Sequence, residues 1–401
     1  MYHATDTQTP SYLLLKQVGR EVMRVVIDGR CIPNQIDGTG RSAINIIRSI
    51  SDRKHKLSLT VLVRTDLSET IRNKLKGHAE MVDIPYRHIH PYTVFRLGSI
   101  VDKFEADLFF SPFMLQPIRM KTPGVITLHD TMWFDRVWTQ AQGRPIRMLV
   151  GKIYFRTLVE LSVRRACKII VPSHSTLDDM ARFWPNRECD CRVIYHGIDK
   201  SFTSFAEESQ VDALIQKFGL TKNGFFLHVT NGKPYKNTPR VIEAFIKIAG
   251  TSDQNLVIVG RKSAFTDSIR GLSAVPGPGE RINFLGSVDD EVVVALYRSA
   301  TALIFPSLFE GFGLPIVEAM ACGCPVITST RGSLGEISGN ASVIVDPENV
   351  DEISNAMTTM GKDQFARSSF IEKGLERSRH FSWEKSAEEI VSVFRGTVHE
   401  S

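Results

Sequence analysis

Short apolar runs that alternate with helix-length segments constrain the fold of this chain more than any other feature. The first half contains five runs, over residues 22–28, 57–63, 108–111, 124–128 and 168–172. The second half contains six, over residues 225–229, 255–259, 282–285, 302–305, 325–328 and 342–345. Continuous apolar runs of this length are typical of strands that are buried on both faces. The alternation therefore predicts an α/β fold with parallel sheets covered by helices.

The alternation of apolar runs and helix-length segments is interrupted once, near Tyr195-His196-Gly197-Ile198-Asp199, and a polar stretch follows. A length of 401 residues suits two domains, since one domain commonly holds about 100–200 residues. We therefore expect two doubly wound, Rossmann-like domains, over residues 22–198 and 199–381. Residues 1–21 are expected to form a polar extension, and Ser382 is a suitable N-cap for a final helix within residues 382–401.

Two glutamates, Glu310 and Glu318, lie eight residues apart in the segment 305–319. Glu310 follows a predicted buried strand, whereas Glu318 lies inside a helix predicted over residues 314–322. The glycines between them permit close approach of a ligand, and the N–H groups at the start of the helix can bind an anion. The two carboxylates can therefore hold two parts of one ligand.

This segment resembles the donor-sugar motif of retaining GT-B glycosyltransferases, in the large family 4 that also contains sucrose synthase and bacterial mannosyltransferases. The resemblance rests on Pro306-Ser307, on the Glu-Gly-Phe-Gly-Leu-Pro core that begins at Glu310, and on the second glutamate. It extends over about residues 23–395. It implies a GT-B fold, in which an acceptor-binding first domain and a nucleotide-sugar-binding second domain face each other across a cleft. It also implies that the final helix crosses back to pack on the first domain.

The resemblance places the donor diphosphate against the loop 231–237, where the family has an Arg followed by a Lys. Lys236 matches the Lys and is expected to stabilise the charge of the leaving phosphate. Asn231 stands at the Arg position, so Lys233 and Arg261 are candidates for the missing charge. A surface lysine cluster is the alternative for Lys236 and Lys233.

Two further loops are expected at the phosphates. One is Gly38-Thr39-Gly40, which resembles the family's first glycine loop and precedes a helix expected to start near Ser42. The N–H groups of Thr39 and Gly40 are its expected donors. The other is the turn Gly311-Phe312-Gly313-Leu314.

His129 follows a predicted strand, at the kind of strand end where open α/β sheets bind ligands. The resemblance places His129 beside the anomeric carbon and the sugar 6-position; a histidine that only caps the next turn is the alternative. Glu310 has two possible roles, as a nucleophile that forms a glycosyl-enzyme or as a carboxylate that holds sugar hydroxyls. The resemblance favours the second role, with the leaving phosphate assisting the acceptor hydroxyl on the same face. It implies that Glu318 holds the ribose hydroxyls.

No Asp-x-Asp sequence occurs in the chain. Hard cations at a diphosphate need such carboxylate oxygens, so we expect a metal-free phosphate site. The pairs Cys189/Cys191 and Cys322/Cys324 lack a second Cys or His pair at zinc-finger spacing. We therefore expect no metal and no cofactor, and reduced thiols as in a cytosolic protein.

The segment from Arg144 to Lys168 carries seven cationic side chains against the single acid Glu160. Two interpretations are open. It is either a basic amphipathic helix that lies on anionic lipid, with Arg144, Arg147 and Arg156 at the surface, or a helix with one buried face and a solvated basic rim. Trp133 is suited to stacking on an acceptor sugar. Together these features suggest a glycan or polyprenyl-linked acceptor at the inner membrane face.

The formal net charge of +5 suits anionic ligands but is too small to indicate nucleic acid as a partner. No apolar stretch approaches the ~18 residues of a spanning helix, and the first twenty residues lack the features of a signal peptide. These observations predict a cytoplasmic protein, with peripheral contact at the inner face of the cytoplasmic membrane.

The sequence thus predicts a retaining, metal-independent glycosyltransferase with a nucleotide-diphosphate hexose as donor. The loop Asn-Gly-Lys-Pro-Tyr-Lys-Asn is similar to that of members that make bacterial polysaccharides, which favours mannose and GDP-mannose. A nucleotide-sugar epimerase or phosphorylase on the same scaffold is one alternative. A non-catalytic nucleotide-sugar-binding partner is the other, supported by the absent Arg at Asn231.

Overall fold

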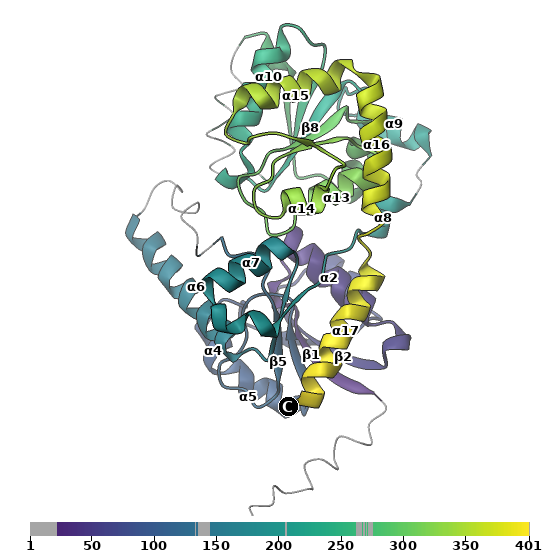
Figure 1. The fold of residues 1–401 in the computed structure, drawn as a ribbon. Helices are drawn as coiled ribbons and strands as arrows, with labels where there is room; N and C mark the ends of the chain where they lie inside the picture. Colours follow the sequence, from purple (N-terminus) through teal and green to yellow (C-terminus); the bar gives the residue numbers. More distant parts are fainter. Residues whose placement is uncertain are drawn as a thin grey trace, which may run out of the picture.

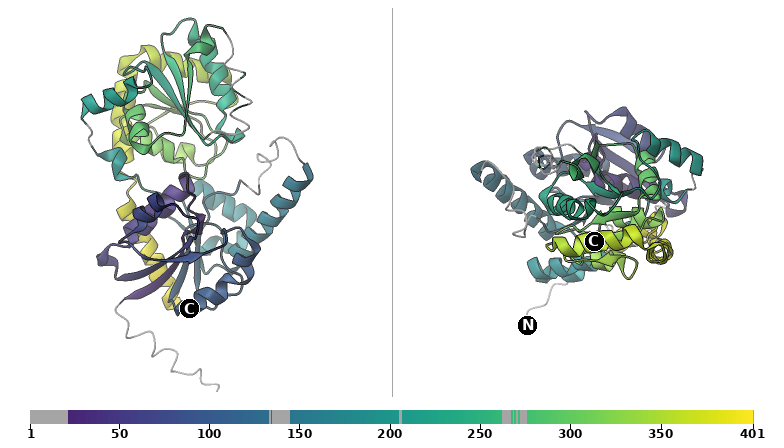
Figure 2. Two further views of the ribbon diagram at one scale, coloured as in Figure 1. Left: turned by 180° about the vertical axis from the view of Figure 1, so that it is seen from behind. Right: turned by 90° about the horizontal axis from the view of Figure 1, so that it is seen from above.

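Two parallel sheets, one in each of two lobes, form the framework of the chain (Figure 1). The fold is taken from a computed structural model, which describes residues 22–132, 134, 145–204, 207–261, 267, 269, 271 and 276–400. The predicted extension over residues 1–21 lies outside the described residues. The view from behind shows the same two lobes, joined at a narrow waist (Figure 2).

The first sheet has seven strands in the order β3-β2-β1-β4-β5-β6-β7. Its strands are β1 (Met23–Asp28), β2 (Leu57–Arg64), β3 (Glu80–Ile84), β4 (Leu108–Ser111), β5 (Gly124–Thr127), β6 (Lys168–Val171) and β7 (Cys191–Val193). The order reverses at β1, which pairs in parallel with β2 on one side and with β4 on the other. Ligands in open α/β sheets bind at such a reversal, beyond the carboxyl ends of the strands.

The second sheet has six strands in the order β10-β9-β8-β11-β12-β13 and reverses at β8 in the same way. Its strands are β8 (Phe225–Thr230), β9 (Asn255–Gly260), β10 (Ile282–Gly286), β11 (Ala302–Phe305), β12 (Val326–Thr328) and β13 (Val343–Ile344). The predicted pair of doubly wound, Rossmann-like domains is thereby confirmed. The predicted join at residues 198 and 199 falls between β7 and β8.

Helices connect the strands and cover the sheets (Figure 1). In the first domain they are α2 (Gly38–Ile50), α3 (Glu69–Leu75), α4 (Pro91–Phe95), α5 (Leu97–Val101), α6 (Pro145–Arg165) and α7 (His174–Phe183). In the second domain they are α8 (Lys200–Thr203), α9 (Glu208–Gln216), α10 (Thr238–Ala249), α12 (Asp290–Ser299), α13 (Leu314–Ala321), α14 (Leu334–Ser338), α15 (Val350–Lys362) and α16 (Gln364–Ser378).

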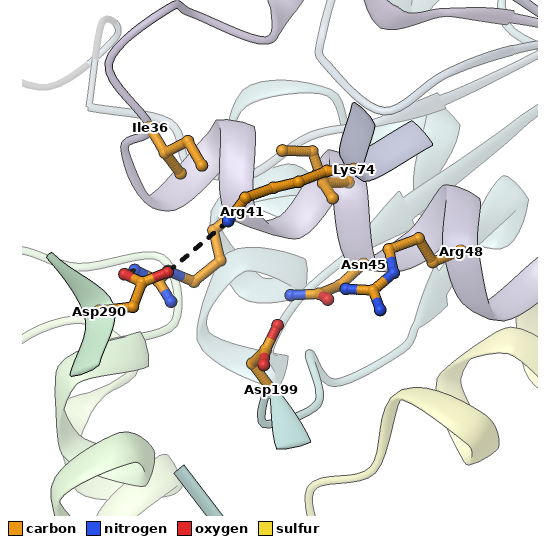
Figure 3. A pocket seen from close by; sticks show the side chains of 8 residues that line it. Ile36, Arg41, Asn45, Arg48, Lys74, Asp199 and Asp290 are labelled. Carbon is orange, nitrogen blue, oxygen red and sulfur yellow. Dashed lines mark hydrogen bonds and ion pairs between the residues drawn. The ribbon is translucent and has the colours of Figure 1, made fainter. Parts of the chain in front are cut away.

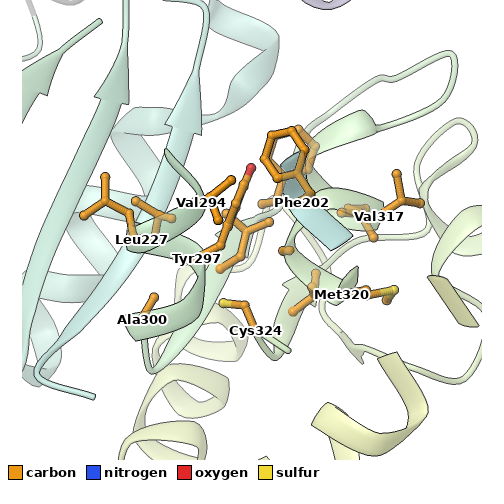
Figure 4. Close-up of a cluster of buried hydrophobic side chains, with 14 of the residues drawn as sticks. Phe202, Leu227, Val294, Tyr297, Ala300, Val317, Met320 and Cys324 are labelled. Carbon is orange, nitrogen blue, oxygen red and sulfur yellow. The ribbon is translucent and has the colours of Figure 1, made fainter. Parts of the chain in front are cut away.

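The core of the second domain forms where helices α12 and α13 pack on the sheet (Figure 4). Tyr297 and Val317 are fully buried there, beside Phe202 of α8. Buried apolar side chains on both faces of the central strands explain why those strands could be read as continuous apolar runs. The packing also fixes α13, the helix that carries Glu318.

The last helix, α17 (Trp383–Glu400), crosses from the second domain back to the first, as predicted (Figures 1 and 2). Ser382 caps it, since its Oγ accepts a hydrogen bond from the Lys385 N–H at 3.3 Å. The apolar face of α17 is buried in the core around β1 and β4. Phe394 is fully buried there, with its ring centroid 5.0 Å from that of Phe110.

Replacement of Phe394 by alanine is expected to lower the free energy of unfolding of the first domain by about 3–5 kcal/mol, since it leaves a cavity at a packed interface. Urea unfolding followed by tryptophan fluorescence measures this, because Trp184 and Trp383 both pack in that domain. Phe365→Ala is the matched control, because Phe365 is 91% exposed and its loss should change stability by less than about 0.5 kcal/mol. A loss below about 1 kcal/mol for Phe394→Ala would contradict the role given to α17.

Candidate active site

The carboxyl ends of β5, β8 and β11 meet where the two domains touch. The loop after β11 packs directly against the residues that follow β5. A Cβ atom on Gly311 would lie 1.8 Å from the carbonyl oxygen of His129, a distance that no side chain permits. Gly313 has a φ of +96°, in the left-handed region that favours glycine. These two glycines let the predicted donor loop reach the first domain.

Lys236 and Glu310, which the sequence placed in separate loops, form an ion pair in this region. The Lys236 Nζ lies 2.6 Å from the Glu310 Oε1, and their side chains are only 9% and 12% exposed. The ammonium also lies 4.5 Å from the centroid of the Phe305 ring, within cation–π range. An ion pair of this kind holds both side chains in fixed positions.

His129 lies beside this loop with a defined tautomer. Its Nε2 is 2.9 Å from the carbonyl oxygen of Pro112, which can only accept, so Nε2 carries the proton. Burial lowers the pKa of His129, which keeps the ring neutral and leaves Nδ1 as an acceptor. A neutral ring nitrogen with a free lone pair can accept a hydrogen bond from a sugar hydroxyl.

Asp130, the next residue, was not predicted as part of the site. One carboxylate oxygen accepts a hydrogen bond from the Met132 N–H at 3.0 Å. The pKa of Asp130 is raised to about 6, mainly by burial; the Met132 hydrogen bond lowers it, and the negative charges of Glu310 and Asp179 contribute to the rise. The cleft therefore contains a carboxyl group that can exchange a proton near neutral pH.

Glu318 lies in α13, and its carboxylate is 7% exposed. Burial raises the pKa of Glu318, and the positive charge of Arg41 counteracts this effect. The Arg41 Nε lies 3.7 Å from the Glu318 Oε1, and the Tyr297 hydroxyl donates to Oε2 at 3.4 Å. The predicted ribose-binding carboxylate is thus approached by an arginine from the other domain.

Arg41 also bridges the domains through Asp290, whose Oδ1 lies 2.5 Å from the Arg41 Nη2. A small pocket opens beside this bridge (Figure 3). Arg48 and Lys74 face Asp199 and Asp290 across it. Charges of both signs alternate around the pocket, so the contact between the domains is electrostatic on this side.

The residues that were predicted to bind phosphate after β8 make different contacts. The Asn231 side-chain amide donates to the Tyr235 hydroxyl at 2.7 Å, so Asn231 braces the loop. Lys233 is exposed, and Arg261 donates from Nη2 to the carbonyl oxygen of Gln35 in the first domain at 3.0 Å. Arg261 therefore lies at the edge of the cleft. There its guanidinium can contact either a bound ligand or the first domain.

The predicted start of the helix near Ser42 was wrong. Helix α2 begins at Gly38, so Gly38, Thr39 and Gly40 form its first turn. Asp37 is the N-cap, and its carboxylate accepts the Gly40 N–H at 2.9 Å, so that donor is already used. The Asp37 cap decided the boundary, because Asp at an N-cap outweighs the low helix propensity of glycine.

Phe312 and Leu314, both predicted to contact the donor, pack against different parts of the protein. Phe312 is 5% exposed and packs against His196 and Phe381, with ring centroids 5.0 and 5.7 Å away. Its ring thus packs in an aromatic cluster between the domains, which leaves its backbone at the predicted phosphate turn. A Cβ on Gly38 would lie 3.8 Å from the Leu314 Cδ1, so the two predicted phosphate loops do meet.

The structure describes only part of the predicted acceptor set. Trp133 and Arg144 lie outside the described residues, and Arg147 falls within α6. Arg156 is exposed, with its guanidinium 4.9 Å from the centroid of the Phe134 ring. One face of α6 is buried through Phe155, Leu158, Val159 and Val163. The described part of α6 thus has one buried face and one exposed face, and both interpretations include an exposed basic side.

Within the described ranges, no group of three or more His, Cys, Asp or Glu side chains is arranged to hold a metal ion. Among the same residues, no helix is long and apolar enough to cross a membrane.

Arg41, Asp290 and Glu336 belong to the contact between the domains, and sequence reasoning missed all three. Glu336 of α14 accepts hydrogen bonds from the N–H groups of His174 and Ser175 in the first domain. A charged residue next to the glycines was the only available signal for Arg41. Asp290 and Glu336 had no such signal, because acidic residues in the first turn of a helix are common on any surface.

Two family models match the chain and together cover most of it. Residues 36–202 match the model described as glycosyltransferase family 4. Residues 210–377 match the model described as glycosyl transferases group 1. The two matches correspond to the first and the second sheet domain.

Several relatives are similar over much of their length. An O-antigen chain mannosyltransferase B from Escherichia coli is 32% identical over 394 residues, which are 93% of this chain and 100% of the relative. An MMP alpha-(1->4)-mannosyltransferase from Mycolicibacterium hassiacum is 26% identical over 71% of this chain and 68% of its own length.

Solved structures share the fold at lower identity. The Anabaena protein Alr3699/HepE, in complex with UDP and glucose, superposes with a TM-score of 0.73 at 19% identity and covers 93% of this chain and 100% of its own. The lipopolysaccharide glycosyltransferase WaaG superposes with a TM-score of 0.72 at 16% identity over 93% of this chain and 100% of its own. These likenesses confirm the GT-B arrangement of the two domains.

Asp130→Asn is expected to stabilise the protein at pH 8 by roughly 1–2 kcal/mol, and the gain should vanish as the pH falls toward 4. In the unfolded chain the pKa of Asp130 is near its ordinary value of about 3.9, whereas in the folded chain it is about 6. Between these values only the folded state binds the extra proton, so the wild type gains stability as the pH falls. Asparagine is neutral throughout and keeps the acceptor for Met132.

Chemical unfolding of both proteins between pH 4 and pH 8 measures this difference. Asp178→Asn, on the exposed side of α7, is the control and should show no such pH dependence. A difference between Asp130→Asn and the wild type that does not change with pH would contradict the raised pKa.

Proposed function

Because this chain belongs to glycosyltransferase family 4, we propose that it is a retaining, metal-independent mannosyltransferase that uses GDP-mannose and elongates a glycan or polyprenyl-linked saccharide. Membership is shown by the two family matches and by the relative that is 32% identical over 93% of this chain. The chain is accordingly a glycosyltransferase with a GT-B fold. The donor, the stereochemistry and the acceptor are the proposal.

One observation carries the proposal, namely that three residues predicted separately converge at the cleft. Lys236 and Glu310 pair at 2.6 Å, and the residue after Glu310 packs on the backbone of His129. The cleft thus combines a cation for a phosphate, a carboxylate for hydroxyl groups and a neutral imidazole acceptor. This set suits a substrate that has a charged leaving group and a neutral sugar.

The proposed chemistry assigns one role to each residue. When the donor binds, Lys236 faces the diphosphate and stabilises the charge that grows as the glycosidic bond breaks. Glu310 holds sugar hydroxyls, and the Nδ1 of His129 accepts another. The acceptor oxygen attacks from the face that the phosphate leaves, and a phosphate oxygen takes the acceptor proton. Glu318 holds the ribose once Arg41 gives up part of its contact with this carboxylate.

Mannose is proposed because relatives named mannosyltransferases cover much of the chain. GDP as the nucleotide is proposed from the similarity of the loop 231–237 to that of members that make bacterial polysaccharides, whereas the similar HepE structure contains UDP and glucose. A binding protein without activity is the second candidate function. The observation in its favour is Asn231, which bonds to Tyr235 at the position where the family has an Arg.

Lys236→Ala and Glu310→Gln are each expected to lower the rate of GDP release from GDP-mannose by roughly 10²–10³-fold, since each removes a charge aimed at the reacting groups. A coupled assay for released GDP, with UDP-glucose as an alternative donor, measures the rates. Lys247→Ala is the matched control, because Lys247 is an exposed lysine of the same domain that pairs with Asp351. If the wild type releases no nucleotide from any donor yet binds one, the non-catalytic alternative holds.

We propose peripheral contact with anionic lipid through the exposed side of α4 and α6. Phe95 and Ile153 are 64% and 56% exposed, unusually high values for large apolar side chains. The Tyr154 hydroxyl donates to the carbonyl oxygen of Ile89 at 3.0 Å, which joins α6 to the segment before α4. Arg156 adds an exposed positive charge nearby on α6. Apolar side chains beside cations are suited to a membrane interface.

Flotation with vesicles that contain anionic lipid tests this contact. The double variant Phe95→Ser/Ile153→Ser is expected to bind at least about tenfold more weakly than the wild type, since each side chain contributes roughly 1.5–3 kcal/mol when buried in lipid. Phe365→Ser, which changes an exposed phenylalanine on the second domain, is the control. Absence of wild-type binding would end this part of the proposal.

A further inference from the structure

We infer that Glu336 is a positioning residue for sugar transfer: by binding the first domain from α14, it holds the loop that contains Glu310 in its working place. The inference rests on the proposed function and adds a residue outside the donor-binding set. Glu336 lies in the second domain, and none of its side-chain contacts described below is to the predicted donor residues.

The carboxylate of Glu336 is bound by three donors of the first domain. Its Oε1 accepts from the His174 N–H at 2.8 Å and from the Tyr195 hydroxyl at 2.8 Å. Its Oε2 accepts from the Ser175 N–H at 3.0 Å. A carboxylate from one domain thus caps the first turn of α7 in the other, where unpaired N–H groups favour a negative charge.

The hydroxyl of Tyr195 is held in this contact as a donor. Burial and the hydrogen bond to Glu336 raise the pKa of Tyr195 to about 12, so the phenol keeps its proton. The same ring packs near Phe312, with a centroid separation of 6.3 Å. The contact therefore adjoins the predicted donor loop.

The same turn of α7 also binds that loop directly. The Ser173 Oγ donates to the carbonyl oxygen of Gly311 at 2.8 Å, and the Thr176 Oγ1 lies 3.2 Å from it. Ser173 is the N-cap of α7, so its position is fixed by the helix that Glu336 binds. The residue after Glu310 is thus held by the first domain.

Glu310 is held from the other side by the segment that leads into α14. Its carbonyl oxygen accepts from the Ser333 N–H at 3.0 Å and from the Ser333 Oγ at 3.1 Å. Ser333 lies three residues before Glu336. A closed path of contacts therefore runs from Glu310 through Ser333 and Glu336 to α7, and back through Ser173 to Gly311.

This closed path has a consequence for catalysis. The carboxylate of Glu310 can face the sugar only while its backbone is held from both sides, and one side exists only when the domains touch. Loss of Glu336 removes the carboxylate that joins α14 to α7, so the loop should become mobile. The residues expected to hold the nucleotide, Lys236 and Glu318, belong to the second domain and should still bind it.

Glu336→Ala is expected to lower kcat roughly 10–100-fold, in line with the loss of hydrogen bonds to a charged group, while the Kd for GDP changes less than about twofold. Glu336→Gln, which keeps an acceptor oxygen, should recover part of the rate. Tyr195→Phe alone should lower kcat roughly 3–10-fold, and it should cost nothing further in the Glu336→Ala background. Glu348→Ala, an exposed carboxylate that pairs with Arg331 in the same domain, is the control.

Hydrogen exchange gives a readout that needs no donor. The amides of residues 307–313 should exchange faster in Glu336→Ala than in the wild type and the control, with little change in the β8–β9 core. If the wild type transfers no sugar, the proposed function fails, and the exchange result still decides whether Glu336 holds the loop. Unchanged exchange in that loop, a kcat within twofold of wild type, or additive effects of Tyr195→Phe and Glu336→Ala would overturn the inference.

Discussion

The contact between Gly311 and the backbone of His129 is the constraint on which the site depends. It brings the carboxyl ends of two separate sheets to one place, and it exists only because residue 311 has no side chain. Everything proposed for catalysis needs this approach, since His129 belongs to one domain and Glu310 to the other. A GT-B enzyme therefore forms its active site where two separately folded domains touch. The relative position of the domains then decides the distances between the active-site residues.

Several charged side chains at this interface lie beside a partner of opposite charge. Lys236 offsets Glu310 within the second domain. Arg41 of the first domain offsets Asp290 and Glu318 of the second. A buried charge without a partner would cost several kcal/mol, so each pair compensates its own burial until a ligand takes over one partner. A donor that carries both phosphates and hydroxyls can replace a contact of each kind.

The framework could be predicted because strands buried on both faces leave an unmistakable apolar pattern. The two strands that the sequence did not reveal, β3 and β7, lie at the edges of the first sheet. Edge strands are half solvated: β3 mixes Glu80 and Asp83 with apolar residues, and β7 has only three residues. The start of α2 was misplaced because the Asp37 cap outweighed two glycines. The donor residues followed from the family resemblance, whereas Arg41 and Glu336 act across the interface and leave no local pattern.

The Arg41 and Glu336 contacts between the domains differ in direction, and this difference bears on how the cleft closes. Arg41 carries a positive charge from the first domain to carboxylates of the second, whereas Glu336 carries a negative charge from the second domain to the amides of α7. A rotation or a translation of one domain would break at least one of these two contacts. Together they therefore favour one relative position of the domains. A donor that draws Glu318 away from Arg41 would weaken that contact, while the Glu336 contact would keep the loop that contains Glu310 in place. Different residues would therefore control release of the nucleotide and positioning of the sugar.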